Sequence, residues 1–107
     1  MASTADFRPL HDFMANIALP SDPPEEFFSL IQAQRVHIDT MIRKGVITSY
    51  SLSLDRSRLW VTLRAHSKED AAEMVANFPL ITWMEIEIQP LMFRETADAL
   101  MFPVSLN

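Results

Sequence analysis

Alternation of apolar and polar residues predicts four β-strands. The first is "HDFMANIAL", residues 11–19, in which every second side chain builds an apolar face. Two more lie in "VITSYSLSLDRSRLWVTLRA", residues 46–65, on either side of a turn at residues 55–58. The last is "ITWMEIEIQPL", residues 81–91. Its two faces are Met84, Ile86 and Ile88 on one side and Trp83, Glu85, Glu87 and Gln89 on the other.

Within residues 46–54 the same period divides the side chains between the two faces of the sheet. The core face is expected to carry Val46, Thr48, Tyr50, Leu52 and Leu54. The opposite face is expected to carry Ile47, Ser49, Ser51 and Ser53.

Helical spacing predicts two helices between these strands. The first covers residues 21–45, with Ser21 or Asp22 as its cap and Gly45, the chain's one glycine, at its end. Its apolar stripe contains Phe27, Leu30, Ile31, Gln34, Ile38, Met41 and Ile42. A buried glutamine needs a hydrogen-bond partner, and Tyr50 on the facing strand can supply one. The second helix begins at the cap Ser67.

The order of elements is therefore β-α-β-β-α-β. Its economical packing is an antiparallel four-stranded sheet with both helices on one face, which is the ferredoxin-like α+β arrangement. We expect residues 1–10 to form a flexible leader and residues 11–93 to form the domain. The tail, residues 94–107, is rich in apolar side chains and is expected to pack on the domain or on a partner subunit.

Composition narrows the classes of function. The net charge is −5, which argues against a nucleic-acid partner. No apolar run is long enough to span a bilayer, so no membrane partner is expected. The chain has no cysteine, and its three histidines lack metal-ligand spacing, so we expect no metal site. The cytoplasm is the expected location.

The face of the sheet away from the helices is polar but carries tryptophan. Two alternatives stay open: the face is a dimer interface and nothing more, or it also encloses a ligand cavity. The side chains expected there are Asp12, Met14, Asn16, Ser49, Ser51, Ser53, Trp60, Thr62, Arg64, Trp83, Glu85, Glu87 and Gln89.

Three short motifs resemble the muconolactone isomerase-like branch of the dimeric α+β barrel superfamily. They are "LPSDPPEE" at residues 19–26, "FPL" at residues 78–80 and "MEIEIQPL" at residues 84–91. The resemblance implies that two ferredoxin-like subunits pair their sheets into a barrel, as a homodimer or a larger homo-oligomer. It also implies an isomerase of an aromatic-degradation intermediate that needs no cofactor. The family's H-x-R positions in the first strand fall here on Asp12 and Met14, with His11 one place away.

Proton transfer next to a carbonyl needs a general base or shuttle and a group that holds the substrate. The candidate catalytic residues are Glu87, which corresponds to the family's glutamate, Glu85, His11 and Asp12. The candidate substrate-binding residues are Trp60, Trp83, Arg64 and Asn16. For the two glutamates the alternative is a structural pair bonded to Arg64 or to the strand serines. For His11 and Asp12 it is an exposed strand start.

Three functions are compatible with these residues. The first is a cofactor-independent isomerase that acts on a lactone or a related compound. The second is a non-catalytic, homo-oligomeric binding or structural protein with the same fold. The third is a cofactorless monooxygenase, which Asn16, Trp60 and Trp83 together would permit.

Overall fold

The computed structural model describes residues 8–96. Its order of strands and helices confirms the predicted β-α-β-β-α-β arrangement. The elements are β1 (His11–Ala18), α1 (Glu25–Ser29), α2 (Ile31–Arg43), β2 (Ile47–Leu52), β3 (Arg58–Ala65), α3 (Lys68–Ala76), a 3-10 helix (Ile81–Trp83) and β4 (Glu85–Pro90).

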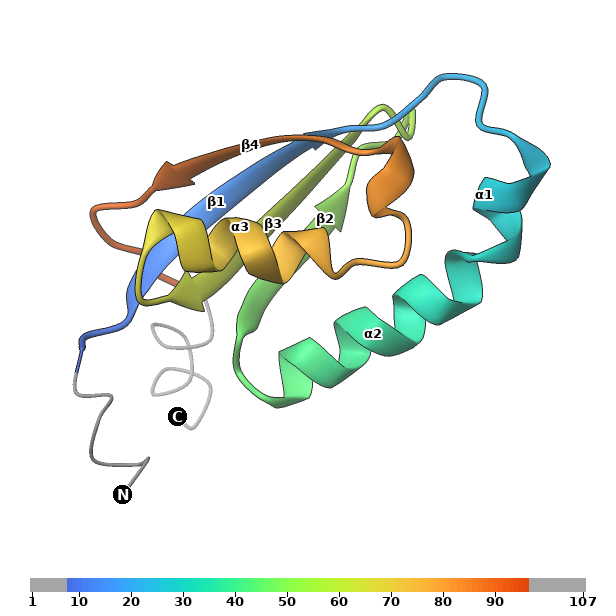
Figure 1. The fold of residues 1–107 in the computed structure, drawn as a ribbon. Coiled ribbons are helices and arrows are strands. Elements are labelled where there is room, and N and C mark those ends of the chain that lie inside the picture. Colours follow the sequence, from blue (N-terminus) through green and yellow to red (C-terminus); the bar gives the residue numbers. More distant parts are fainter. Residues whose placement is uncertain (1–7, 97–107) are drawn as a thin grey trace, which may run out of the picture.

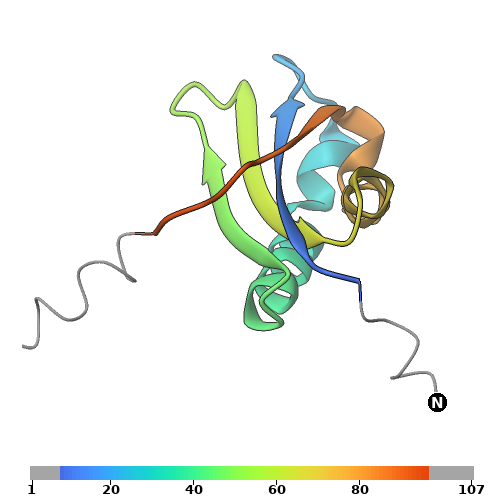
Figure 2. The same ribbon diagram turned by 90° about the vertical axis from the view of Figure 1, so that its left-hand side faces the viewer.

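The four strands form one antiparallel sheet in the order β2-β3-β1-β4. Helices α2 and α3 lie on the same face of this sheet (Figures 1 and 2). The other face carries no helix of the described chain, and we call it the open face. The ferredoxin-like α+β fold expected from the sequence is therefore confirmed.

The core lies between the sheet and the helices, as the alternation predicts. Side chains of β1 and β3 alternate between buried and more exposed, so each strand gives one face to the core. The fully buried residues include Ala15, Ile17, Val61, Leu63 and, from α3 and the turn after it, Val75 and Phe78. The Ser67 hydroxyl accepts a hydrogen bond from the Asp70 backbone N–H, which confirms the predicted cap of α3.

The first helix differs from the prediction of one continuous element from residue 21. It is broken at Leu30, and it begins at Glu25 because Pro24 keeps an extended conformation with φ −72° and ψ 168°. Neither Ser21 nor Asp22 caps it. Ile31 and Ile42 belong to the predicted buried stripe, but they are 37% and 45% exposed.

The predicted faces of β2 are wrong at its start. A register shift between Ile47 and Ser49 places Ile47 opposite Leu63, where it is 3% exposed in the core. This is the effect of a β-bulge, which inserts one residue and reverses the alternation beyond it. Ser49 and Ser51 remain on the open face, opposite Thr62 and Trp60.

Both predicted terminal segments extend beyond the described part of the chain. Residues 1–7 of the leader and residues 97–107 of the tail lie outside it. Leu91 to Thr96, which follow β4, are described and bear on the site below. Among the described residues, no helix has the length and hydropathy needed to cross a bilayer.

One buried polar side chain joins three parts of the fold. Gln34 on α2 is 3% exposed. Its Nε2 donates to the Tyr50 hydroxyl at 3.2 Å, and its Oε1 accepts from the Leu80 backbone N–H at 3.1 Å. The predicted pairing of Gln34 with Tyr50 is confirmed. The side chain thereby ties α2 to β2 and to the segment that leads into β4.

Replacing Gln34 with alanine should destabilise the domain. The change leaves the Leu80 N–H buried without an acceptor, which typically costs about 1–3 kcal/mol. Urea denaturation should show a loss of this size, whereas Gln32→Ala, an exposed change on the same helix, should cost little. Equal losses from both changes would mean that the Gln34 bridge is not a main tether of α2.

Tyr50 should titrate above its ordinary range. Burial raises its pKa from 10.0, against smaller lowering effects of the Gln34 hydrogen bond and the Arg35 charge. Because the folded pKa is raised, stability should be complete below about pH 10 and should fall as the pH rises through the folded value. Tyr50 is the chain's single tyrosine, so phenolate absorbance reports it directly. The midpoint of this titration should be lower when urea unfolds the protein. An unchanged midpoint would contradict the effect of burial on the pKa of Tyr50.

Candidate functional site

The strand register gathers three of the predicted site residues into one row on the open face. Asn16 on β1 lies opposite Trp60 on β3 and, across the other edge of β1, opposite Glu87 on β4. Ser51 on β2 extends the row beyond Trp60. Directly opposite side chains on one face of a sheet lie close enough to act on the same small molecule.

Beside this row the surface is hollowed by a depression of about 250 Å³. Asn16, Ala18, Arg58, Glu85, Ile86 and Glu87 line it. The Arg58 Nη1 donates to the Asn16 Oδ1 at 3.3 Å, so the guanidinium is held at the depression that the two carboxylates also line. A larger depression, about 490 Å³, follows the outer edge of β4 and α3, but its lining carries fewer polar groups.

The two glutamates at the depression are available for chemistry. Glu85 and Glu87 are exposed, and neither carboxylate accepts a hydrogen bond from, or forms an ion pair with, a residue in the described range 8–96. The predicted structural alternative, a bond to Arg64 or to the strand serines, is therefore not found within these residues. A free carboxylate beside a guanidinium and an amide can take up and return a proton on a bound anion.

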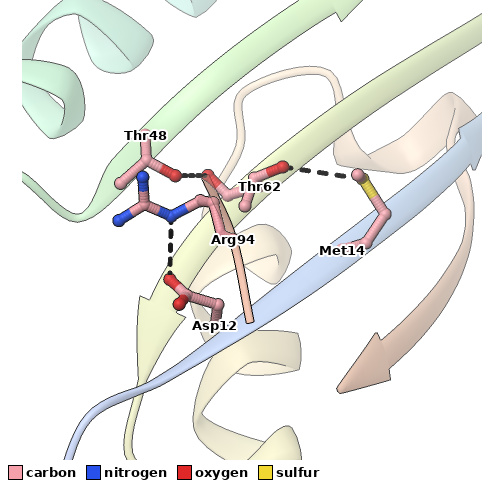
Figure 3. Close-up of polar contacts among 5 residues, drawn as sticks. All are labelled: Asp12, Met14, Thr48, Thr62 and Arg94. Atoms are coloured by element: carbon pink, nitrogen blue, oxygen red, sulfur yellow. Dashed lines mark hydrogen bonds and ion pairs between the residues drawn. The ribbon is translucent and has the colours of Figure 1, made fainter. Parts of the chain in front are cut away.

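The opposite end of the open face is organised by an ion pair that the sequence did not indicate. Arg94, after β4, donates from its Nε to the Asp12 Oδ1 at 3.1 Å. Figure 3 shows these side chains with Thr48, Thr62 and Met14. Thr62 is 4% exposed and donates to the Met14 sulfur at 3.7 Å, so this end is far more enclosed than the Glu87 end.

This ion pair changes the expectation for Asp12. Its carboxylate is bound to Arg94 rather than combined with His11 as an acid–base element. His11 is exposed at the first residue of β1. Arg64 lies opposite Asp12 in the strand register but is exposed, and its side chain is away from the Glu87 row. The structure thus separates His11, Asp12 and Arg64 from Asn16, Trp60, Glu85 and Glu87.

The placement of Trp83 on the open face is wrong. Residues Ile81–Trp83 form a 3-10 helix, and β4 starts only at Glu85. The Trp83 ring packs edge-on against Phe27 of α1, with ring centroids 5.7 Å apart. It therefore lies on the helix side of the sheet and does not shield Glu87. The residues that a monooxygenase would combine, Asn16, Trp60 and Trp83, are not brought together.

Sequence reasoning missed two arginines of the open face. Arg58 could have been found, since it precedes Trp60 by two residues and the alternation of β3 already placed Trp60, Thr62 and Arg64 on this face. Arg94 had no comparable signal, because its partner lies 82 residues away in the sequence.

The histidines do not form a metal centre in the described part of the chain. Over these residues, no group of three or more His, Cys, Asp or Glu side chains could hold an ion. The ring of His37 on α2 packs edge-on against Phe78, with ring centroids 5.7 Å apart. Its Nε2 is buried and has no hydrogen-bond partner among these residues.

Comparison with known proteins places this geometry in context. The model of the family described as muconolactone delta-isomerase matches residues 10–95. A crystal structure of muconolactone isomerase is similar with a TM-score of 0.63 and 17% identity, covering 80% of this chain and 93% of that one. A putative antibiotic biosynthesis monooxygenase from Nitrosomonas europaea has a TM-score of 0.44 and 13% identity, covering 82% and 91% of the two chains. A search of curated protein sequences found no match.

Proposed function

The chain belongs to the muconolactone isomerase family, and on this basis we propose that it is a cofactor-independent enzyme that moves a proton within a small anionic substrate. The substrate class is a lactone or a related intermediate of aromatic breakdown. The observation that carries the proposal is the convergence of Arg58, Asn16 and Glu87 on one depression from three neighbouring strands.

Each of these side chains has a distinct role in the proposed reaction. Glu87 removes a proton next to a carbonyl group and returns it at another carbon, which requires a carboxylate that is not engaged in an ion pair. Arg58 binds the substrate carboxylate, for which a planar guanidinium is well suited. Since the Asn16 Oδ1 accepts from Arg58, the Asn16 amide N–H groups remain to donate to the carbonyl oxygen as it gains charge.

We further propose that the open face is covered by a second copy of the chain. Trp60 is 38% exposed there, and the candidate site is open to water on a single chain. Proton transfer gains from the exclusion of water, because charges then interact more strongly with the substrate. A homodimer that pairs two open faces would supply this enclosure, and the same pairing without catalysis is the alternative that the experiments below separate.

Replacing Glu87 with glutamine should abolish most of the activity while the fold and the oligomer persist. Glutamine keeps the shape of the side chain but lacks a basic oxygen, and loss of a positioned general base typically costs about 100- to 10,000-fold in rate. The measurement is isomerisation of muconolactone followed by absorbance or NMR. Glu73→Gln, an exposed change on α3, is the matched control and should be neutral.

Two results would contradict this role. Full activity of Glu87→Gln would assign the proton shuttle to another group, with Glu85 at the same depression as the next candidate. Dissociation of the Glu87→Gln protein would show that the residue serves the interface. A wild-type protein without activity on muconolactone, but with an intact oligomer, would favour the non-catalytic alternative or a different substrate.

The pairing of open faces should depend on Trp60. Trp60→Arg puts a charge at the centre of the proposed interface, and the sedimentation equilibrium should shift toward monomer by at least about tenfold in dissociation constant. Val36→Arg is the control, because Val36 is 56% exposed on α2, which lies on the other face of the sheet. A wild-type protein that is strictly monomeric at micromolar concentration would overturn the pairing.

A further inference from the structure

A short turn after β4 is held at both ends by a single residue of β1. The Leu91 backbone N–H donates to the Asp12 carbonyl oxygen at 2.9 Å. Three residues later, Arg94 donates to the Asp12 carboxylate at 3.1 Å. Asp12 thus fixes the turn once through its backbone and once through its side chain, and we call residues 91–94 the pinned turn.

The pinned turn presents two large apolar side chains to solvent. Met92 is 95% exposed and Phe93 is 69% exposed, although the residues on either side of them are anchored. In Figure 2 this segment leaves β4 toward the side of the sheet away from the helices. Two adjacent, largely exposed apolar side chains on a fixed backbone are typical of a contact with another molecule.

We propose that the pinned turn of one copy places Phe93 over the mouth of the depression of a second copy, beside the second copy's Arg58. The inference rests on the proposed pairing of open faces and names the residue that closes the site. Phe93 complements the depression chemically, since a guanidinium binds the face of an aromatic ring and Trp60 offers a further aromatic surface.

The position of the two features in the sheet determines the orientation of the pair. The pinned turn lies at the Asp12 end of β1, whereas the depression lies at the Ala18 end, six positions further along the strand. Six strand residues span roughly 20 Å, so Phe93 cannot reach the depression of its own chain. A two-fold axis that runs across the strands exchanges these ends and places each pinned turn over the other copy's depression.

This arrangement makes each candidate site depend on both chains. On one chain the depression is a shallow surface feature lined by exposed Arg58, Glu85 and Glu87. Small-molecule sites normally bury most of the ligand surface. The partner copy's Phe93 would supply the missing apolar wall and exclude water from the carboxylates.

The chain contains no cysteine, so engineered disulfides can report the contact without background. We would mix a tagged Phe93→Cys chain with an untagged Ala18→Cys chain, allow the subunits to exchange and oxidise the mixture. Non-reducing gels and mass spectrometry should then show a product of one tagged and one untagged chain in excess over both products of identical chains. A disulfide requires Cα atoms within about 7 Å, so the mixed product reports direct contact.

The outcomes separate this inference from the proposed pairing. An excess of the product between two Phe93→Cys chains would mean that equal ends of the sheets meet, and would overturn it. A dimer by sedimentation that gives no disulfide would overturn it while leaving the pairing intact. A strict monomer would overturn both.

A second measurement applies if the cysteine chains fold poorly. Phe93→Ser should raise the dimer dissociation constant at least about tenfold, as loss of a central aromatic contact does. Val36→Ser removes an apolar side chain that is 56% exposed on α2, on the helix side of the sheet, and should leave the constant unchanged. Equal effects of the two changes, or none from Phe93→Ser, would count against this contact.

Discussion

The candidate site depends on the position of β1 inside the sheet, between β3 and β4. Because β1 pairs along both edges, each residue from Phe13 to Ala18 has a neighbour on either side, and the three side chains lie on the same face of the sheet. The ladder that buries Ala15 and Ile17 therefore also aligns Asn16 with Trp60 and Glu87. A slip of one residue would exchange these two sets, so the register that builds the core is the register that builds the site.

The sequence was sufficient to assign side chains to the correct face of the sheet wherever the two-residue period was unbroken. The alternation of β1 and β3 predicted the core residues and placed Asn16 and Trp60 on the open face. The same rule would also have placed Arg58 on that face. The prediction of faces from alternation failed where local backbone geometry interrupts the two-residue period. The bulge after Ile47 puts that residue in the core rather than on the open face, and the turn into β4 takes Trp83 to the helix side, where Phe27 provides an aromatic partner.

Contacts between distant parts of the chain could not be predicted from the sequence. Nothing in the composition of the tail distinguishes Arg94 from other exposed cations, and its role is visible only because β4 ends beside the start of β1. Asp12 illustrates the same limit. A carboxylate next to a histidine at a strand start is a reasonable acid–base candidate, yet the structure gives it an ion pair and a backbone contact with the same turn.

Arg58 and Arg94, both on the open face, differ in how far their positive charge is balanced by a partner. Arg94 is paired with a carboxylate, so its positive charge is largely balanced at the Asp12 end. Arg58 bonds to a neutral amide, which fixes the guanidinium in place without reducing its charge. In the proposed reaction Arg58 is therefore the cation that a substrate carboxylate would meet at the depression, beside the negative charges of Glu85 and Glu87. In the proposed enzyme the first strand thus contributes the amide that positions the cation, while the cation itself comes from β3.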